Sequence, residues 1–284
     1  MSPTQKTSVR GEVSNQNESS TPTELRLAAL HNLAECDPTR KAQSVRELAK
    51  LSDSIELDAN AILIPQQLIP GRPQQPELVA PRLLKHRSMV TPEGRATLIH
   101  AMAHIEFNAI NLALDALWRF PNMPRAYYTD WLMVAGEEAL HFSLLAEHLQ
   151  NLGYQYGDFP AHNSLWEMAD KTKHDILARI ALVPRTMEAR GLDATPQVRA
   201  KLAQAGDMAA AAIMDRILTD EIGHVLVGNR WYAYLCQQRG LEAIATYRQL
   251  ATQYAAPVLR KPFNLAARKA AGFSEAELEA LGGQ

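Results

Sequence analysis

Two short motifs with the same chemistry recur far apart in the chain. Residues 137–141 read EEALH and residues 220–224 read DEIGH, so each motif is an acid, a glutamate, two further residues and a histidine. A spacing of three places the glutamate and the histidine of each motif on one face of a helix. Both faces are otherwise apolar, where a charged glutamate is costly unless something compensates it. Glutamate and histidine in this pattern indicate metal ligation.

Two further glutamates lie at matching intervals. Glu106 lies on an apolar stripe, 13 residues before a predicted helix end (119 − 106 = 13). Glu138 lies 13 residues after the start of the next predicted helix (138 − 125 = 13). In an antiparallel pair both would lie about 20 Å from the turn, at 1.5 Å per residue. The interval from Glu106 to Glu138 is 138 − 106 = 32, and that from Glu188 to Glu221 is 221 − 188 = 33. We therefore predict a metal site with two matching halves, each made of one Glu-x-x-His motif and one further glutamate.

The predicted metal ligands are Glu106, Glu138, His141, Glu188, Glu221 and His224. Four carboxylates carry four negative charges, which two divalent cations would neutralise. Mixed carboxylate and imidazole ligation suits iron or manganese better than an ion that prefers thiolates. We expect two metal ions, with iron the first choice and manganese the second.

Several alternatives remain open at this stage. Glu188 lies close to Gly191, near an expected helix end where the dipole disfavours an anion, and could instead pair with Arg185 or Arg190. Glu137 would replace Glu138 as a ligand if its helix were rotated. His100 and His104 are spaced for a second metal site, but neither shares the stripe of Glu106, so we expect His104 to be structural or to support the ligands, and His100 to be solvated.

Helical patterns must position these residues. The segment 1–20, rich in Ser, Asn, Gln and Thr, is expected to be disordered. Residues 21–91 read as short helices, the first capped by Thr23, followed by an extended strap whose prolines forbid regular helix. Residues 92–240 contain four long amphipathic helices, and 241–284 contain shorter helices expected to pack on them. No alternating β-branched run occurs, so the predicted fold class is all-α.

The four long helices have recognisable ends. Thr91-Pro92-Glu93 begins the first, which runs to about residue 119, and the second runs from 125 to about 152 before Gly153. The third is predicted over 164–190 with a bend at Pro184. The fourth is predicted over 207–239. Shorter helices are predicted over 241–254 and 274–281.

Composition excludes several classes of protein. The 29 basic and 31 acidic residues give a net charge of −2, which argues against nucleic-acid binding by bulk electrostatics. The two cysteines, Cys36 and Cys236, are too few for a disulfide framework and lack zinc-site spacing. No secretory signal and no run of about 18 apolar residues is present, so we expect no membrane association and a cytoplasmic location. The basic segments 82–95 and 260–269 could bind an anionic partner or form solvated surface.

The whole constellation resembles the ferritin-like di-iron/di-manganese carboxylate superfamily. One glutamate on each of two helices and Glu-x-x-His on the other two is the arrangement of that superfamily. The resemblance covers about 92–240 and implies a four-helix bundle, with additional N- and C-terminal helices, in which Glu106 and Glu188 are terminal or bridging ligands. It also implies that Glu137 hydrogen-bonds His224 and that Asp220 hydrogen-bonds His141. The wider sequence is similar to a bacterial ferritin-like family known chiefly as a domain of unknown function.

Three functions follow as hypotheses. The first is a di-metal, most plausibly di-iron, oxidoreductase that activates dioxygen or peroxide toward an unidentified small molecule or nucleoside, as a monomer or homodimer supplied by an unknown electron donor. The second is metal storage or detoxification in the manner of ferritins. The third is a non-enzymatic helical binding module that uses the metal for stability. The sequence departs from many superfamily oxygenases in having Leu140 and Gly223, rather than arginine, before the two histidines.

Overall fold

The computed structural model describes residues 24–52, 54–85 and 87–282. Over these residues the chain is helical, with two isolated β-bridges and no strand, which confirms the all-α prediction. No helix in the described ranges combines the length and the apolar composition needed to cross a bilayer. The predicted disordered tail, residues 1–20, lies outside the described residues.

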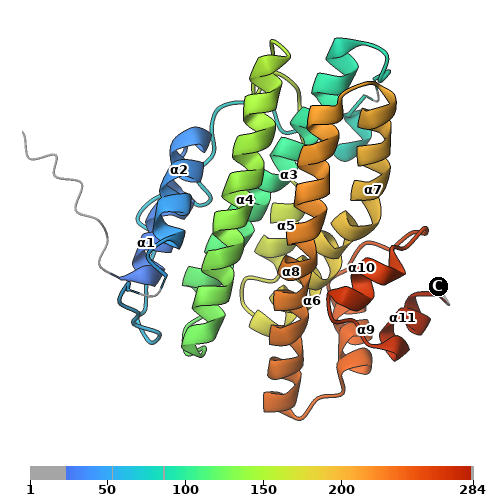
Figure 1. The fold of residues 1–284 in the computed structure, drawn as a ribbon. Helices are drawn as coiled ribbons and strands as arrows, with labels where there is room; N and C mark the ends of the chain where they lie inside the picture. Colours follow the sequence, from blue (N-terminus) through green and yellow to red (C-terminus); the bar gives the residue numbers. More distant parts are fainter. Residues whose placement is uncertain (1–23, 53, 86, 283–284) are drawn as a thin grey trace, which may run out of the picture.

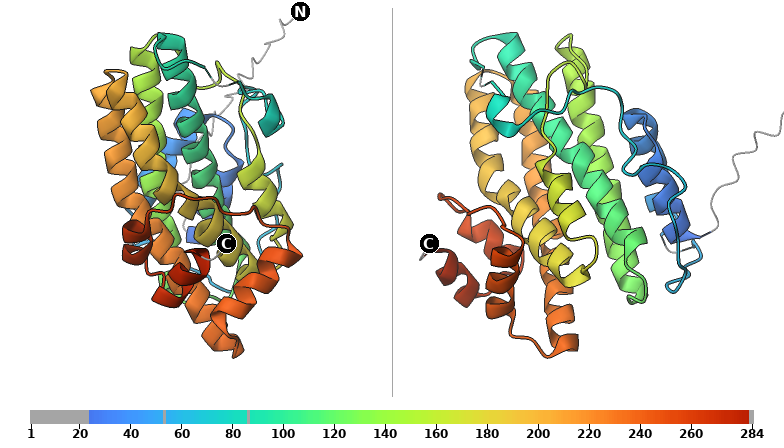
Figure 2. Two further views of the ribbon diagram at one scale, coloured as in Figure 1. Left: turned by 90° about the vertical axis from the view of Figure 1, so that its right-hand side faces the viewer. Right: turned by 180° about the vertical axis from the view of Figure 1, so that it is seen from behind.

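Four long helical rods lie side by side (Figures 1 and 2). Three are single helices: α3 (Pro92–Arg119), α4 (Arg125–Asn151) and α8 (Met208–Arg239). The fourth is composite and consists of α6 (Ile176–Leu182), a π-helical segment η2 (Val183–Glu188) and α7 (Ala189–Gln204). Helix α3 packs against α4, and α8 packs against α4, α6 and α7, so the four rods enclose a common core.

The ends of α3, α4 and α8 agree with the sequence predictions because they are set by local capping. The Thr91 hydroxyl accepts a hydrogen bond from the backbone N–H of Gly94 at the start of α3. The Asp207 carboxylate accepts one from Ala210 at the start of α8. Gly153 (φ +82°) follows α4, and Gly240 (φ +62°) ends α8, both in the left-handed region that favours glycine.

The third long helix was predicted wrongly. The predicted helix over 164–190 is divided into α5 (Ser164–Lys171), a turn, and the composite rod, which continues to Gln204. Gly191, which follows the predicted helix end, lies inside α7, and so does Pro196. Buried side chains of α7, including Leu192 and Leu202, pack in the core, and this tertiary burial outweighs the unfavourable helix propensity of glycine and proline.

Because the composite helix continues to Gln204, Glu188 lies near its middle rather than near its C-terminal end. Glu188 lies 16 residues before the end of α7 (204 − 188 = 16). Glu221 lies 13 residues after the start of α8 (221 − 208 = 13), which is a similar distance along the helix. The two helices are joined by a short turn and pack together. Glu188 and Glu221 are therefore at a similar level, because residues 191–204 run along α8 as part of α7.

Two N-terminal helices and a strap cover the outside of α3 and α4. Helices α1 (Leu25–Ala34) and α2 (Pro38–Ala49) pack on α3 and α4 respectively. The N-cap of α1 is Glu24 rather than Thr23, which lies outside the described residues. The strap, residues 64–80, contains no helix, as predicted, and is followed by the short 3-10 helix η1 (Pro81–Leu83).

The strap is tied to the helices by a glycine and by a buried lysine. The Gly71 N–H donates to the Leu33 carbonyl at 2.7 Å, and a Cβ at position 71 would lie 2.1 Å from the carbonyl oxygen of Ala34. The ammonium group of Lys41 donates to the carbonyls of Leu33 and Gly71 and to the side chain of Asn111 on α3. These contacts fix the strap relative to α3.

Three C-terminal helices pack on the second half of the bundle. They are α9 (Ala243–Gln253), α10 (Leu265–Ala270) and α11 (Glu275–Gly282), and α10 was not predicted. Arg268, from the basic segment 260–269, is fully buried and forms an ion pair with Asp193 at 2.6 Å. Lys269 pairs with Glu275. Arg268 and Lys269 of this segment therefore have structural partners.

A buried charge network links α3 to α6. Asp115 is fully buried and accepts hydrogen bonds from Arg119 on its own helix and from Arg179, which is also buried, on α6. Although burial alone would raise the pKa of Asp115, the two guanidinium groups hold it below its usual value. One buried carboxylate thus serves two guanidinium groups.

We expect Asp115→Ala to lower the free energy of unfolding by about 3–5 kcal/mol, because Arg179 would remain buried without a counter-charge. Urea denaturation followed by circular dichroism measures the change. The matched control is Asp215→Ala, which removes an exposed partner of Arg199 and should have a much smaller effect. Equal losses in the two variants would contradict this account.

Candidate metal centre

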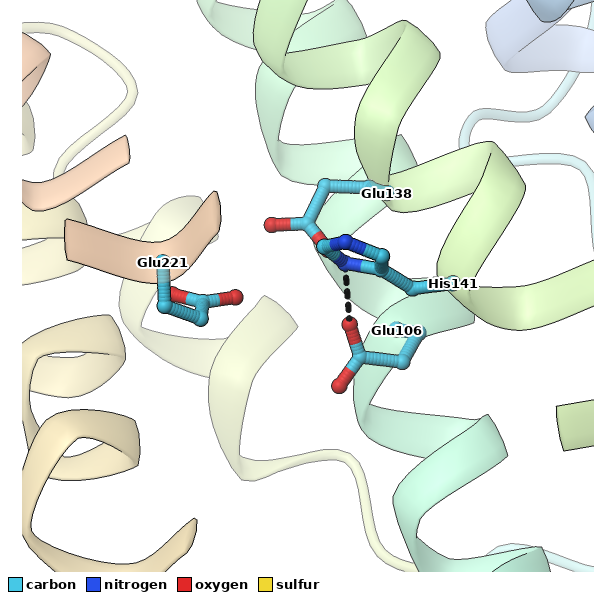
Figure 3. Close-up of side chains that lie close together, drawn as sticks. All are labelled: Glu106, Glu138, His141 and Glu221. Atoms are coloured by element: carbon cyan, nitrogen blue, oxygen red, sulfur yellow. Dashed lines mark hydrogen bonds and ion pairs between the residues drawn. The ribbon is translucent and has the colours of Figure 1, made fainter. Parts of the chain in front are cut away.

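Four buried side chains from three helices converge at the centre of the bundle. Glu106 comes from α3, Glu138 and His141 from α4, and Glu221 from α8 (Figure 3). One possible ligand atom from each lies within 4.8 Å of the others, and all four residues are buried. This group could hold a metal ion.

His141 presents one ring nitrogen to the cluster and the other to a supporting acid. Its Nδ1 lies 3.3 Å from Glu106 and 3.4 Å from Glu138, and its Nε2 lies 3.0 Å from Asp220. A carboxylate that accepts the Nε2 proton leaves the Nδ1 lone pair for a ligand. Asp220 also accepts a hydrogen bond from Arg216, one turn earlier on α8. The i,i+4 spacing of this pair was visible in the sequence, but its role was not recognised.

His224 has the same arrangement on the other side of the cluster. Its Nδ1 lies 2.9 Å from Glu138 and 3.5 Å from Glu221, and its Nε2 lies 2.7 Å from Glu137. Both hydrogen bonds implied by the superfamily resemblance, Glu137 to His224 and Asp220 to His141, are present. Because Glu137 is engaged there and is partly exposed, Glu138 is the glutamate that faces the cluster.

Glu188 lies on the π-helical segment and is not among the four residues whose ligand atoms lie within 4.8 Å of one another, but it interacts with them electrostatically. Its Oε2 atom is buried without a hydrogen-bond partner, and its carboxyl interacts electrostatically with Glu221, Glu138 and His224. Of the two arginines that could have paired with it, Arg185 instead bonds Asn229 and Glu277, and Arg190 is exposed. A π-helical turn is frequently found at functional sites, and here it carries Glu188.

Three buried polar atoms of the cluster lack hydrogen bonds. They are Oε1 of Glu138, Oε2 of Glu188 and Nδ1 of His224. The Glu138 and His224 atoms approach to 2.9 Å without the geometry of a hydrogen bond. Buried polar atoms are rarely left unsatisfied, and each has a lone pair that a cation can accept. The donor set therefore fits a metal ion better than it fits a self-contained hydrogen-bond network.

The electrostatics of the cluster are those of crowded acids in apolar surroundings. Burial and the charge of Glu138 raise the pKa of Glu106, and burial and neighbouring carboxylates likewise raise the pKa of Glu188 and Glu221. Burial alone would lower the pKa of His141, but hydrogen bonds with Glu106 and Glu138 raise it to about 11. In the absence of a cation, protons therefore compensate the negative charge.

The two histidines of α3, His100 and His104, make their contacts outside the metal cluster. The ring nitrogens of His104 lie 2.9 Å from the Tyr156 hydroxyl and 3.0 Å from the His162 carbonyl, so its hydrogen bonds connect it to the loop after α4 rather than to the ligands. The prediction that His100 is solvated was wrong. His100 is fully buried, stacks on Tyr156 and accepts a hydrogen bond from the Gly157 N–H.

The chain belongs to the family described as "Protein of unknown function (DUF455)", whose model matches residues 34–279. It is also similar to a protein of Haemophilus influenzae described as "Uncharacterized protein", with 51% identity over 240 residues, 82% of this chain and 81% of the relative. No solved structure matches the chain significantly.

Because His141 and His224 of the cluster hold protons at neutral pH, a metal ion must displace protons when it binds. The pKa of His141, raised to about 11, and the raised pKa of His224 predict that the affinity for Mn²⁺ increases as the pH rises from 6.5 to 7.5, with about one proton or more released per chain. Calorimetric titration in buffers of different ionisation enthalpy measures the release. Binding that is independent of pH and releases no proton would contradict the predicted charge state.

Proposed function

We propose that this chain is a ferritin-like four-helix-bundle protein that holds two divalent metal ions, iron in the first place and manganese as the alternative, and acts as an oxidoreductase. The observation that supports the proposal best is the close approach of buried Glu138 and His224 atoms that form no hydrogen bond with each other. The ligands proposed are Glu106, Glu138, His141, Glu188, Glu221 and His224.

The charges of this ligand set support two ions rather than one. Four ionised carboxylates would carry four negative charges in the apolar centre of the bundle, and two divalent cations balance them. Glu106, Glu138 and His141 would form one half of the site, and Glu188, Glu221 and His224 the other. Glu138 lies near both histidines, at 3.4 Å from His141 and 2.9 Å from His224, so we assign it a bridging position between the halves.

Iron in such a site would supply the redox chemistry, the binding and reduction of dioxygen or peroxide. The residues of the chain fix the geometry. Asp220 and Glu137 orient the two imidazole rings through their Nε2 atoms, and Arg216 in turn holds Asp220. The aromatic rings of Phe107 and Phe142, which directly follow Glu106 and His141 in sequence, pack against each other and help to exclude water from this side of the site. We place the activity in the cytoplasm.

A double variant, Glu138→Ala with Glu221→Ala, tests the site. We expect the parent protein, purified from cells supplemented with iron and manganese, to contain about two metal ions per chain, and the variant to contain nearly none, because it loses two of the four carboxylates. Elemental analysis measures the content. The matched control is Glu147→Ala with Asp215→Ala, which removes two exposed acids from the same helices.

The control variant should retain the metal content of the parent. Circular dichroism should show that all three proteins are helical, so that a loss of metal is not a loss of fold. Equal metal content in the parent and in the Glu138→Ala, Glu221→Ala protein would refute the assigned site.

The redox role has a separate test. After anaerobic reduction of the iron-loaded protein, exposure to oxygen should change its optical spectrum, and size-exclusion chromatography should show a monomer or dimer. A shell of many subunits would instead support metal storage in the manner of ferritins. A metal that is redox-silent under oxygen would support the third hypothesis, a binding module stabilised by its metal.

A further inference from the structure

A second polar site lies on a different side of α3, between that helix, the strap and the loop after α4. It is a small, partly open pocket of about 20 Å³. The strap and the loop lie together there, joined by hydrogen bonds between the Val79 N–H and the Ala161 carbonyl and between the Ala161 N–H and the Glu77 carbonyl (Figure 2). The lining residues that matter here are Arg72, Pro76, Leu78, His104, Phe107 and Asn163.

Arg72 is a partly buried cation at this pocket. Its guanidinium lies over the ring of Trp166 at 6.0 Å, and within the described ranges it takes part in no hydrogen bond or ion pair. Burial lowers the pKa of Arg72, although Glu167 interacts with it electrostatically from the first turn of α5. An arginine has five N–H donors, and leaving them unsatisfied in a partly desolvated position is unfavourable.

Asn163 adds further donors at the same pocket. It is the N-cap residue of α5, but its side chain accepts no hydrogen bond from the helix. This is unusual because an asparagine at this position ordinarily caps the helix. Its amide remains available to a ligand, and the positive end of the α5 dipole lies at the rim of the pocket.

The remaining walls are neutral or apolar. The two ring nitrogens of His104 are engaged with the Tyr156 hydroxyl and the His162 carbonyl, so the ring offers no free group to a ligand. Pro76, Leu78 and Phe107 supply apolar surface. The pocket therefore offers one positive charge, a few donors and an apolar wall.

We propose that this pocket binds the carboxylate group of a small organic acid. Arg72 and Asn163 donate hydrogen bonds to the carboxylate, which matches the planar fork of a guanidinium, and the apolar body of the acid packs against Pro76 and Leu78. A phosphate dianion fits less well, because only one cation lines the pocket and no second charge would neutralise it.

The test uses butyrate as the probe, with butyramide as its uncharged isostere and inorganic phosphate as the competing kind of anion. Isothermal titration calorimetry on the full chain should show saturable binding of butyrate, and butyramide and phosphate should each bind about tenfold more weakly or worse. Arg72→Met, which keeps the aliphatic stem but loses the charge, should weaken butyrate binding by about tenfold or more.

Two control proteins separate this pocket from other sources of binding. Arg82→Met removes an exposed cation from the neighbouring segment and should bind butyrate as the parent does. The Glu138→Ala, Glu221→Ala protein should also retain binding, because the pocket does not use the metal ligands. If that protein loses butyrate binding, the acid binds at the metal centre and the pocket proposal is wrong, while the metal site stands.

Two other outcomes would also overturn the proposal. One is equal affinity of the parent and the Arg72→Met protein for butyrate, with both folded by circular dichroism. The other is tighter binding of phosphate than of butyrate, which would assign the pocket to a phosphate group instead.

Discussion

The burial of several carboxylates against two imidazole rings is the constraint on which the rest of the structure depends. Ionised acids in an apolar core repel one another and lose their hydration, so the cluster persists only if protons or cations compensate its charge. The residues and helices around the cluster hold its side chains in place. Asp220 and Glu137 lie on the outer side of the two rings and fix their orientation, and well-capped helices on either side hold the glutamates at one level.

The composite rod shows how the chain accommodates this constraint. A π-helical turn contains one more residue per hydrogen-bonded ring than an α-helix, which rotates the residues that follow it. Pro184 has no N–H to donate, and the Thr186 hydroxyl bonds the Ala181 carbonyl at 2.8 Å within this turn. Gly228 on α8 allows the close approach, because a Cβ there would lie 2.8 Å from the Cβ of Pro184. The irregular turn and the glycine opposite it together bring Glu188 toward the cluster.

Sequence reasoning succeeded where the determining interactions are local. The start of α3 at Thr91 and the end of α8 at Gly240 depend on caps within a few residues, and the two Glu-x-x-His motifs depend only on helical periodicity. It failed where tertiary packing determines whether a segment is helical or a side chain is buried. Gly191 resembles a helix end, yet α7 continues through it and through Pro196 because its buried side chains pack in the core. The burial of His100 depends on the loop after α4, which is distant in sequence, and could not be read from its own helix.

Helix α3 places the metal cluster and the carboxylate pocket on two of its faces. Glu106 points into the bundle, while His104, two residues earlier, lies at the pocket. Phe107 belongs to both regions, because it lines the pocket and packs against Phe142, the residue after His141. A helix is stiff over a single turn, so the distance between the two sites is fixed by the backbone rather than by flexible loops. An organic acid held by Arg72 would therefore occupy a constant position relative to the metal centre.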